Sequence, residues 1–351
     1  MRLWDLSGAV RFLEAVGRSL NDGVSVVVRF PGVMPLGFQD AVITDVKGLN
    51  FVRFKCTRSP FEGLCKKYAP SALSTAGDLR GLCEHEGFRG KLIWLDSLNP
   101  KMWQQWREFL TKYAQVNRFM SSLGRTLFVV PLEGEPPEEP PKNDVTMATH
   151  DWSDVIDEMD LLFWANDRLL QKGMNYSQRI LLATTVAHIA SWDFDIAMRL
   201  LDERPHVILA PCEMLRSVAK ERGWTTHTPV DWQLGTASKS GIEHAALAAL
   251  EDPPRTIQNR LWSAQAAVLL PQIESQRVKI VRNNMSKFRR ALQYKDPLDV
   301  ELSELERSVY SRTYCKVHDN VKYLRDARND LAHLCPLVPE KALELAQFKL
   351  A

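Results

Sequence analysis

The segment Glu133–Asp144, with the sequence EGEPPEEPPKND, divides this chain into two parts of different character. It contains four prolines and four glutamates, a composition that favours an extended, solvated conformation. Before it, strand-like apolar runs alternate with helical segments, whereas nearly everything after it has helical periodicity. We therefore expect a linker at residues 133–145 that separates an α/β domain from a mostly helical part.

The first part predicts an α/β domain over residues 1–132. Candidate strands are Val24–Phe30, Gly48–Lys55, Lys91–Asp96 and Thr126–Leu132. Candidate helices are Leu6–Leu20, Gly37–Val46, Ser74–Glu86 and Lys101–Leu123. Alternation of strands and helices is typical of a largely parallel sheet covered by helices.

The second part predicts an all-helical middle region, residues 146–252, and a helical C-terminal domain, residues 253–351. In the middle region, apolar stripes indicate helices at Asp154–Leu170, Ser177–Leu201 and Pro211–Arg222, with a looser segment at Thr225–Ser240 leading to Ile242–Leu250. The run Asp252-Pro253-Pro254 marks the boundary between the two regions. Beyond it, Arg255–Leu292 is expected to be a long helix, broken or bent at Pro271.

The first candidate strand is followed by a glycine pair with the spacing of a phosphate-binding loop. Gly32 and Gly37 stand in a G-x-x-x-x-G pattern between a strand and a helix. A working loop continues with a lysine that reaches the terminal phosphates and a hydroxyl residue that binds magnesium. Phe38 and Gln39 occupy those two positions here. The pattern therefore argues against nucleotide hydrolysis, and an ordinary strand-turn-helix explains it equally well.

The strand Lys91–Asp96 is similar to a Walker B strand that ends in an acidic residue, although Ser97 follows where a glutamate would be expected. Together with the glycine pair, it makes the N-terminal half resemble a degenerate P-loop domain of the STAND or AAA+ type. Such inactivated domains occur in prokaryotic conflict-system proteins. The resemblance implies a sensor or interaction module, with a possible protein partner or trigger, and no bound cofactor is expected.

Near the C-terminus, Arg328, Asn329 and His333 form the pattern R-N-x-x-x-H. An arginine can neutralise a phosphate with two parallel hydrogen bonds. A histidine titrates near neutrality, so it can take a proton from a ribose hydroxyl or give one to a leaving oxygen. These residue types suit RNA cleavage without a metal. The structural alternative is that Arg328 pairs with a neighbouring aspartate and His333 caps its helix.

The surrounding sequence, YLRDARNDLAHLCPL, resembles the C-terminal part of HEPN domains (higher eukaryote and prokaryote nucleotide-binding). Helical spacing predicts one helix at Val317–Leu334 and a short final helix at Glu340–Leu350. The resemblance covers roughly residues 255–351, and it implies that Arg328, Asn329 and His333 are catalytic. Positions five apart on a helix lie about 140° from each other. A bend in the helix, or the same motif from a second chain, must then complete the site. HEPN ribonucleases use a dimer for this, so the resemblance implies a homodimer at least in the active state.

The stretch Arg277–Lys295 contains seven basic residues and no acidic one. Lysine and arginine neutralise phosphates, so this charge asymmetry supports RNA binding by the same domain. A solvated helix face is the alternative explanation. The residues expected to bind RNA are Arg277, Lys279, Arg282, Lys287, Arg289, Arg290 and Arg325.

Composition adds only exclusions. The net charge is +2, and the six cysteines form no CxxC pair, so neither a zinc ribbon nor a thioredoxin-type site is expected. The chain shows no apolar run of membrane-spanning length and no secretory signal pattern, so we expect a cytoplasmic protein.

The leading hypothesis from the sequence is a regulated, metal-independent endoribonuclease of the HEPN type, acting in prokaryotic defence against phage. The alternative is a non-catalytic HEPN adapter or sensor subunit of a larger defence complex. A third hypothesis, an ATP-driven switch, is disfavoured by Phe38 and Gln39.

Overall fold

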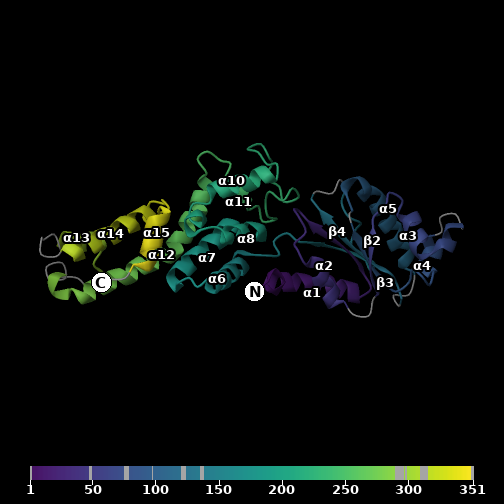
Figure 1. Cartoon of the computed structure of the whole chain (residues 1–351), viewed down its shortest axis with the longest axis horizontal. Coiled ribbons are helices and arrows are strands. Elements are labelled where there is room, and N and C mark those ends of the chain that lie inside the picture. Colours follow the sequence, from purple (N-terminus) through teal and green to yellow (C-terminus); the bar gives the residue numbers. More distant parts are fainter. Residues whose placement is uncertain are drawn as a thin grey trace. The chain divides into compact units, whose positions relative to one another are not determined.

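A computed structural model describes residues 2–46, 50–74, 79–96, 98–119, 124–134, 138–288, 296, 299–308 and 315–348. The chain forms two compact units (Figure 1). We call Arg2–Val155 together with Pro229–Ile242 the sheet unit. The helical unit comprises Ile156–Thr228 and Glu243–Ala351.

The sheet unit is built on a five-stranded sheet in which every pair is parallel. Its strands are β1 (Ser25–Phe30), β2 (Asn50–Lys55), β3 (Lys91–Asp96), β4 (Leu127–Glu133) and β5 (Met147–Asp151). Their order across the sheet is β2-β3-β4-β1-β5. The expected α/β domain with a largely parallel sheet is therefore confirmed.

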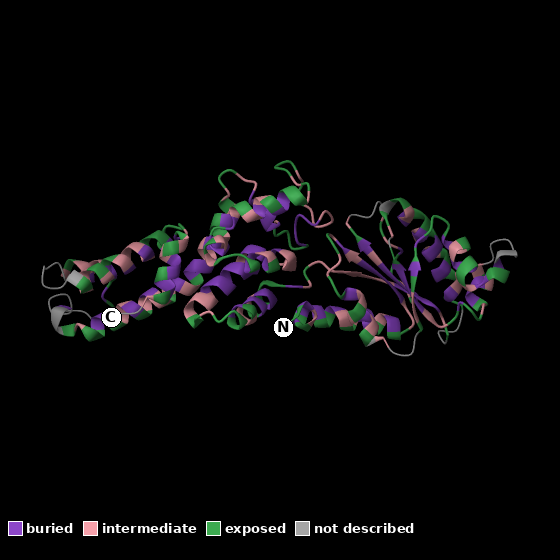
Figure 2. Ribbon diagram, in the orientation of Figure 1, coloured by how far each residue is buried: buried purple, intermediate pink, exposed green. Residues whose placement is uncertain are grey.

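Helices cover both faces of this sheet. They are α1 (Ser7–Asn21), α2 (Phe38–Asp45), α3 (Pro60–Tyr68), α4 (Leu79–Glu84) and α5 (Pro100–Asn117), with short 3-10 turns η1 (Leu3–Asp5) and η2 (Pro70–Ser74). Side chains of β1 alternate between the faces, so Val26 and Val28 pack with α1 and α2, while Val27 packs with α3, α4 and α5. This two-sided burial, visible in Figure 2, explains the continuous apolar runs of the strands.

The sheet unit extends past residue 132, where the sequence suggested its end. After β4, the described residues 138–144 lie along α5 rather than in solvent, since Trp103 Nε1 donates to the Glu138 carbonyl at 2.7 Å and Arg107 pairs with the Glu138 carboxylate at 3.0 Å. Asp144 then accepts hydrogen bonds from the amides of Thr146 and Met147, which starts β5. Local hydrogen bonds therefore hold the described residues 138–144 as part of the sheet unit.

The helical unit contains the remaining helices. They are α6 (Glu158–Gln171), α7 (Tyr176–Ala190), α8 (Phe194–Asp202), α9 (Pro205–Ile208), α10 (Cys212–Glu221), α11 (Ala245–Ala248), α12 (Arg255–Asn283), α13 (Leu302–Ser308), α14 (Cys315–Ala332) and α15 (Pro339–Gln347), with a 3-10 turn η3 (Met285–Phe288). The expected helix Ser177–Leu201 is in fact two helices. Ser191 has φ of 57°, and Asp193 caps the start of α8.

Helix α12 runs without interruption across Pro271 and ends at Asn283. A break at Pro271 is therefore absent from this described helix, and the expected extension to Leu292 lies outside the described residues. Helices α14 and α15 match the two helices expected near the C-terminus, and both pack on α12.

Candidate functional sites

The loop between β1 and α2 carries the two glycines of the phosphate-loop pattern. Gly37 adopts φ of 82° and forms the N-cap of α2. A Cβ atom at Gly37 would lie 3.0 Å from Trp4 Nε1, which donates to the Leu36 carbonyl at 2.9 Å. Glycine is thus required here by a left-handed turn and a close indole contact. Both requirements are structural.

Phe38 stands where a phosphate loop would place its lysine, and its side chain is fully buried. The rings that surround it at centroid distances of 5.1–6.3 Å are those of Trp4, Phe12, Phe30 and Trp94. The position therefore belongs to the aromatic core between the sheet and helices α1 and α2. A cation at this site would have to enter that core, at a large desolvation cost.

Asp96 ends β3, as the Walker B-like pattern predicted, and it is exposed. Its backbone carbonyl accepts a hydrogen bond from the Cys56 amide at 3.0 Å. Burial, and secondly the charge of Asp96, raises the pKa of Cys56 to about 12, so this thiol is not a nucleophile at neutral pH.

The carboxyl ends of β1 and β5 carry a charged cluster that the sequence did not reveal. Arg29 on β1 pairs with Asp151 on β5, and with Glu139 at 2.9 Å. Lys239 reaches the same Asp151 at 2.5 Å. The Trp232 ring lies 5.1 Å from the Arg29 guanidinium and 5.0 Å from Lys239 Nζ. Although burial alone would raise the pKa of Asp151, hydrogen bonds from Arg29 and Lys239 lower it.

In the helical unit, the motif Arg328, Asn329 and His333 lies at the C-terminal end of α14. Arg328 is half-buried, and Asn329 and His333 are exposed. Within the helix, the five-residue offset turns Arg328 about 140° from His333. One chain therefore does not bring the two side chains onto one helical face, in agreement with the sequence argument.

The end of α14 is a Schellman turn with His333 at the C-cap. Leu334 has φ of 60°, and the amide of Cys335 bonds to the Asp330 carbonyl at 3.0 Å. Leu334 also donates to the Leu331 carbonyl at 3.3 Å. This turn ends α14 at Ala332 and leaves the His333 side chain exposed just beyond the last helical residue.

Two side chains of α12 form hydrogen bonds with the backbone on either side of this turn. Trp262 Nε1 donates to the Leu331 carbonyl at 2.6 Å. The amide of the fully buried Gln265 both donates to the Leu337 carbonyl at 3.0 Å and accepts from the Leu337 amide at 2.6 Å. The segment that carries His333 is therefore held at both ends by side chains of one helix.

Glu274 on α12 faces the arginine of the motif. Its Oε1 lies 3.8 Å from Arg328 Nε, and its Oε2 accepts from Arg277 Nε at 2.7 Å. Arg277 also donates to the Val300 carbonyl at 2.7 Å. Arg328 consequently has a carboxylate, rather than a phosphate, as its neighbour within this chain.

The residues expected to bind RNA have different surroundings. Arg277 is engaged in the contacts just described, and Arg325 pairs with Glu306 and with Asp326 at 2.5 Å. Lys279 and Arg282 are exposed on α12 and keep the predicted role as a prediction. Arg289, Arg290 and the side chain of Lys287 lie outside the described residues.

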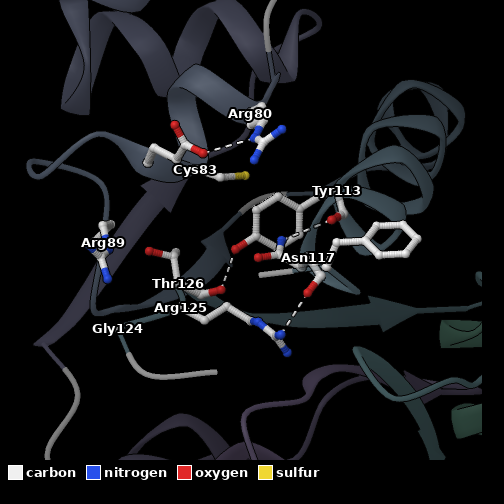
Figure 3. Close-up of a pocket in the computed structure, with 10 residues that line it drawn as sticks. Arg80, Cys83, Arg89, Tyr113, Asn117, Gly124, Arg125 and Thr126 are labelled. Atoms are coloured by element: carbon white, nitrogen blue, oxygen red, sulfur yellow. Dashed lines mark hydrogen bonds and ion pairs between the residues drawn. The ribbon is translucent and has the colours of Figure 1, made fainter. Parts of the chain in front are cut away.

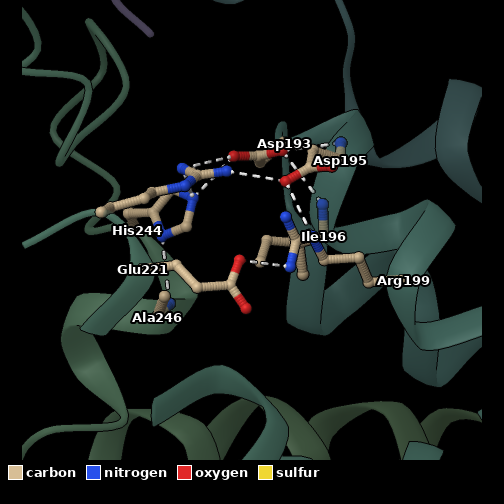
Figure 4. Close-up of polar contacts among 8 residues, drawn as sticks. Asp193, Asp195, Ile196, Arg199, Glu221, His244 and Ala246 are labelled. Atoms are coloured by element: carbon tan, nitrogen blue, oxygen red, sulfur yellow. Dashed lines mark hydrogen bonds and ion pairs between the residues drawn. The ribbon is translucent and has the colours of Figure 1, made fainter. Parts of the chain in front are cut away.

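A buried cluster in the helical unit was missed by the sequence reasoning (Figure 4). Asp193 Oδ1 caps α8, and its Oδ2 accepts from His244 Nε2 at 2.6 Å and from Arg222 at 3.1 Å. His244 Nδ1 accepts from the Ala246 amide at 3.0 Å, which caps α11. Because Nδ1 accepts and Nε2 donates, the imidazole is neutral.

The electrostatics of this cluster agree with a neutral imidazole. Burial, first, lowers the pKa of His244, and it outweighs the hydrogen bond to Asp193. Burial would raise the pKa of Asp193, but the hydrogen bond from His244 and the charge of Arg222 bring it well below its ordinary range. Trp192 and Trp224 pack edge-on against the ring at 5.4 and 4.8 Å.

A pocket of about 270 Å³ lies at the amino end of β4 (Figure 3). Tyr113 donates to the Thr126 carbonyl at 2.5 Å, and Arg125 donates to the carbonyls of Asn117 and Gly23 at 2.7 and 3.1 Å. These hydrogen bonds hold the start of β4, so we assign a structural role to the polar side chains that line the pocket.

Within the residues that the structure describes, no group of three or more histidine, cysteine or acidic side chains is placed to hold a metal ion. No helix in the described part of the chain is long and apolar enough to cross a membrane.

Comparison with known proteins gives little. The chain matches no protein-family model and no curated protein sequence. Among solved structures it is similar to the "Structure of Drosophila ORC bound to poly(dA/dT) DNA and Cdc6 (conformation 1)", with 10% identity and a TM-score of 0.24 over 96% of this chain and 69% of that chain. A similarity of this size does not identify a fold, so the functional reasoning rests on the residues themselves.

Proposed function

We propose that this chain is a regulated, metal-independent endoribonuclease of the HEPN type whose sheet unit senses a signal without hydrolysing nucleotide. The observation that carries the proposal is the setting of Arg328, Asn329 and His333. They lie at an accessible helix end, and the turn beyond them is fixed by Trp262 and Gln265. These hydrogen bonds give the helix end a fixed shape, as a preorganised site requires.

Each residue of the motif has a chemical role in the proposed reaction. Arg328 binds the scissile phosphate and stabilises the charge that develops on it. His333 transfers the proton between the ribose 2′-hydroxyl or the leaving 5′-oxygen and solvent, and Asn329 orients one of these groups. The 2′-oxygen attacks phosphorus as the 5′-oxygen leaves, so the product carries a 2′,3′-cyclic phosphate, and the proposed step requires no metal.

The proposed active form is a homodimer, because one α14 points Arg328 and His333 in different directions. The test mixes the inactive variants Arg328→Ala and His333→Ala. If each site takes Arg328 from one chain and His333 from the other, random pairing restores about a quarter of wild-type cleavage. If the two side chains act within one chain, the mixture stays inactive. A mixture that stays inactive while sedimentation shows mixed dimers would contradict a shared site.

The sheet unit supports the sensing part of the proposal. Its fold is a parallel α/β sheet with a glycine loop after β1, while the lysine position of that loop is the buried Phe38. A P-loop-like domain of this kind has no built-in cation for a developing phosphate charge. We therefore assign it to binding a partner or trigger, in the setting of prokaryotic defence against phage that the sequence resemblance implies.

The second candidate is a non-catalytic HEPN adapter or sensor subunit of a larger defence complex, and one contact favours it. Glu274 lies 3.8 Å from Arg328, where it competes with a phosphate for the guanidinium. An adapter binds RNA or a partner equally well with His333→Ala, whereas the ribonuclease loses cleavage and keeps RNA binding.

A further inference from the structure

One internal segment belongs to a different unit from the residues on both sides of it. Pro229–Ile242, which we call the strap, is part of the sheet unit, while Thr228 before it and Glu243 after it belong to the helical unit. The chain therefore passes from one unit to the other and back within this short stretch. Any change in how the strap is held is transmitted along the backbone to both of its ends.

The strap has its own compact turn. The amides of Thr236 and Ala237 donate to the Asp231 carbonyl at 3.1 and 3.2 Å. The hydroxyl of Thr236 accepts from the Asp231 amide at 2.9 Å and donates to the Pro229 carbonyl at 2.6 Å. Because these bonds lie within the strap, the turn keeps its shape whether or not it is docked.

The strap is buried at Thr236, Ala237 and Ser238, and its hydrogen bonds and ion pairs with the rest of the sheet unit come from the more exposed residues on either side. Lys239 pairs with Asp151, the Ser240 amide donates to Asp154 at 3.2 Å, and Trp232 covers the guanidinium of Arg29. Gly235 approaches the phosphate-loop pattern itself, since a Cβ atom there would lie 3.0 Å from the Pro31 carbonyl. Ion pairs and cation–π contacts at partly exposed sites are individually weak.

The strap occupies the place where open parallel sheets bind their ligands. Arg29 and Asp151 lie at the carboxyl ends of β1 and β5, and Pro31 follows β1 directly. Ligands of such sheets bind outside the carboxyl ends of the strands. The end at which the strap returns is firmly anchored, because the buried His244 is bonded to Asp193 just beyond it.

From this arrangement we propose that the strap is a releasable latch that covers the carboxyl edge of the sheet. When it is docked, Trp232 covers Arg29, Lys239 pairs with Asp151, and Gly235 lies against the Pro31 carbonyl. When it is released, the ligand edge is uncovered, and residues 229–242 are no longer held by the sheet unit. The latch is the structural element through which the proposed sensing acts. It does not depend on RNA cleavage by the C-terminal domain.

Hydrogen exchange of the full-length chain tests the latch. In Lys239→Ala, the amide of Ser240, which donates to Asp154 outside the strap, is expected to exchange up to about fivefold faster than in the wild type, while β1 and α7 are unchanged. Raised salt should act in the same direction on the wild type, because it screens the pair with Asp151. Trp232→Ala is a second release variant, and it removes the ring rather than the charge.

The matched control is Lys67→Ala. Lys67 lies over the rings of Phe54 and Tyr68 in the same unit, at 5.4 and 5.2 Å, and makes no contact with the strap among the described interactions. It should leave strap exchange unchanged. The proposal is overturned if strap amides exchange only together with those of β1, in the wild type and in both release variants. That result would make the strap a permanent part of the sheet unit, whatever the outcome of RNA cleavage assays.

Discussion

His244 is the residue whose surroundings constrain its chemistry most. It is buried between Trp192 and Trp224, its Nε2 donates to Asp193, and its Nδ1 accepts a hydrogen bond from the Ala246 amide. The charged groups that face it are Asp193, Arg222 and Arg260, and two of these three are cations. A protonated imidazole would lose the cap of α11 and meet those cations, so the fold selects the neutral form.

This selection predicts a pH dependence of stability. The pKa of His244 is lower in the folded chain than its ordinary value of 6.5, so the unfolded chain binds the extra proton as pH falls below 6.5. The free energy of unfolding should therefore fall from pH 7 toward pH 5, with a slope of at most about 1.4 kcal/mol per pH unit for one proton. In urea unfolding measured at several pH values, the free energy of unfolding of His244→Gln should depend less on pH than that of the wild type. The exposed variant His227→Gln should keep the wild-type pH dependence.

Glu274 gives a second prediction at this scale. Glu274→Gln removes the carboxylate beside Arg328 and keeps the shape of the side chain. We expect RNA to bind up to about fivefold more tightly, since a partly exposed ion pair is worth up to about 1 kcal/mol. The matched control is Glu213→Gln, which removes an exposed pair with Arg216 in the same unit. Equal RNA affinities for Glu274→Gln and the wild type would show that Glu274 does not compete with phosphate.

At the scale of elements, strands β1, β3 and β4 were predictable because each is a largely buried apolar run. Strand β2 lies at the sheet edge with one buried side chain, Phe54, and was predictable from its aromatic and β-branched residues. Strand β5, with the sequence MATHD, was not predicted, since it is short and polar and is placed in the sheet by the turn at Asp144. The docking of the strap was likewise hidden, because it depends on contacts with residues such as Arg29 and Pro31 that are distant in sequence. Local patterns carry no information about such pairings.

The candidate site also contains some residues that the sequence predicted and others that it did not. Arg328, Asn329 and His333 could be named from their spacing; Arg328 and Asn329 lie on α14, and His333 is the residue after its end. Their catalytic role stays a prediction. The supports Trp262 and Gln265 were not predicted, because an indole and an amide on a helix read as ordinary surface or core residues. The sequence predicts that Arg277 and Arg325 bind RNA, whereas in the structure partners on other elements engage both side chains.

Gln265 yields a prediction about the coupling of α12 to the end of α14. Gln265→Leu leaves the backbone amide and carbonyl of Leu337 buried without their partner. The expected loss is about 2–4 kcal/mol in the free energy of unfolding, from two unsatisfied polar groups. Circular dichroism during chemical unfolding measures it. Gln258→Leu, on the same helix, serves as the control, and equal stability of the two variants would contradict the support role.

Phe38 yields a prediction about α2 and its loop. The double change Phe38→Lys with Gln39→Ser restores the letters of a phosphate-loop motif but puts an ammonium group into the aromatic core. We expect the sheet unit to lose about 3–5 kcal/mol of stability and to gain no ATP hydrolysis. Measurable turnover of ATP by a stable double variant would contradict the structural role assigned to this position.

At the scale of the whole molecule, the chain combines a sheet unit whose glycine loop has Phe38 at the position of the phosphate-binding lysine and a helical unit that carries the pattern R-N-x-x-x-H. In the proposed function, a trigger bound at the carboxyl edge of the sheet acts through the strap, which belongs to the sheet unit and is joined to the helical unit at both ends. Removal of the trigger site should then change the regulation of cleavage and leave its chemistry intact. The central claim therefore concerns the catalytic role of Arg328, Asn329 and His333.

The most direct measurement is RNA cleavage by the purified full-length chain in EDTA, comparing the wild type with His333→Ala and with Arg325→Ala, with the product ends mapped. The account predicts 2′,3′-cyclic phosphate ends from the wild type, loss of cleavage in His333→Ala and cleavage retained in Arg325→Ala, whose arginine is held by Glu306 and Asp326. Equal cleavage by the wild type and His333→Ala, or cleavage that EDTA abolishes, would contradict it.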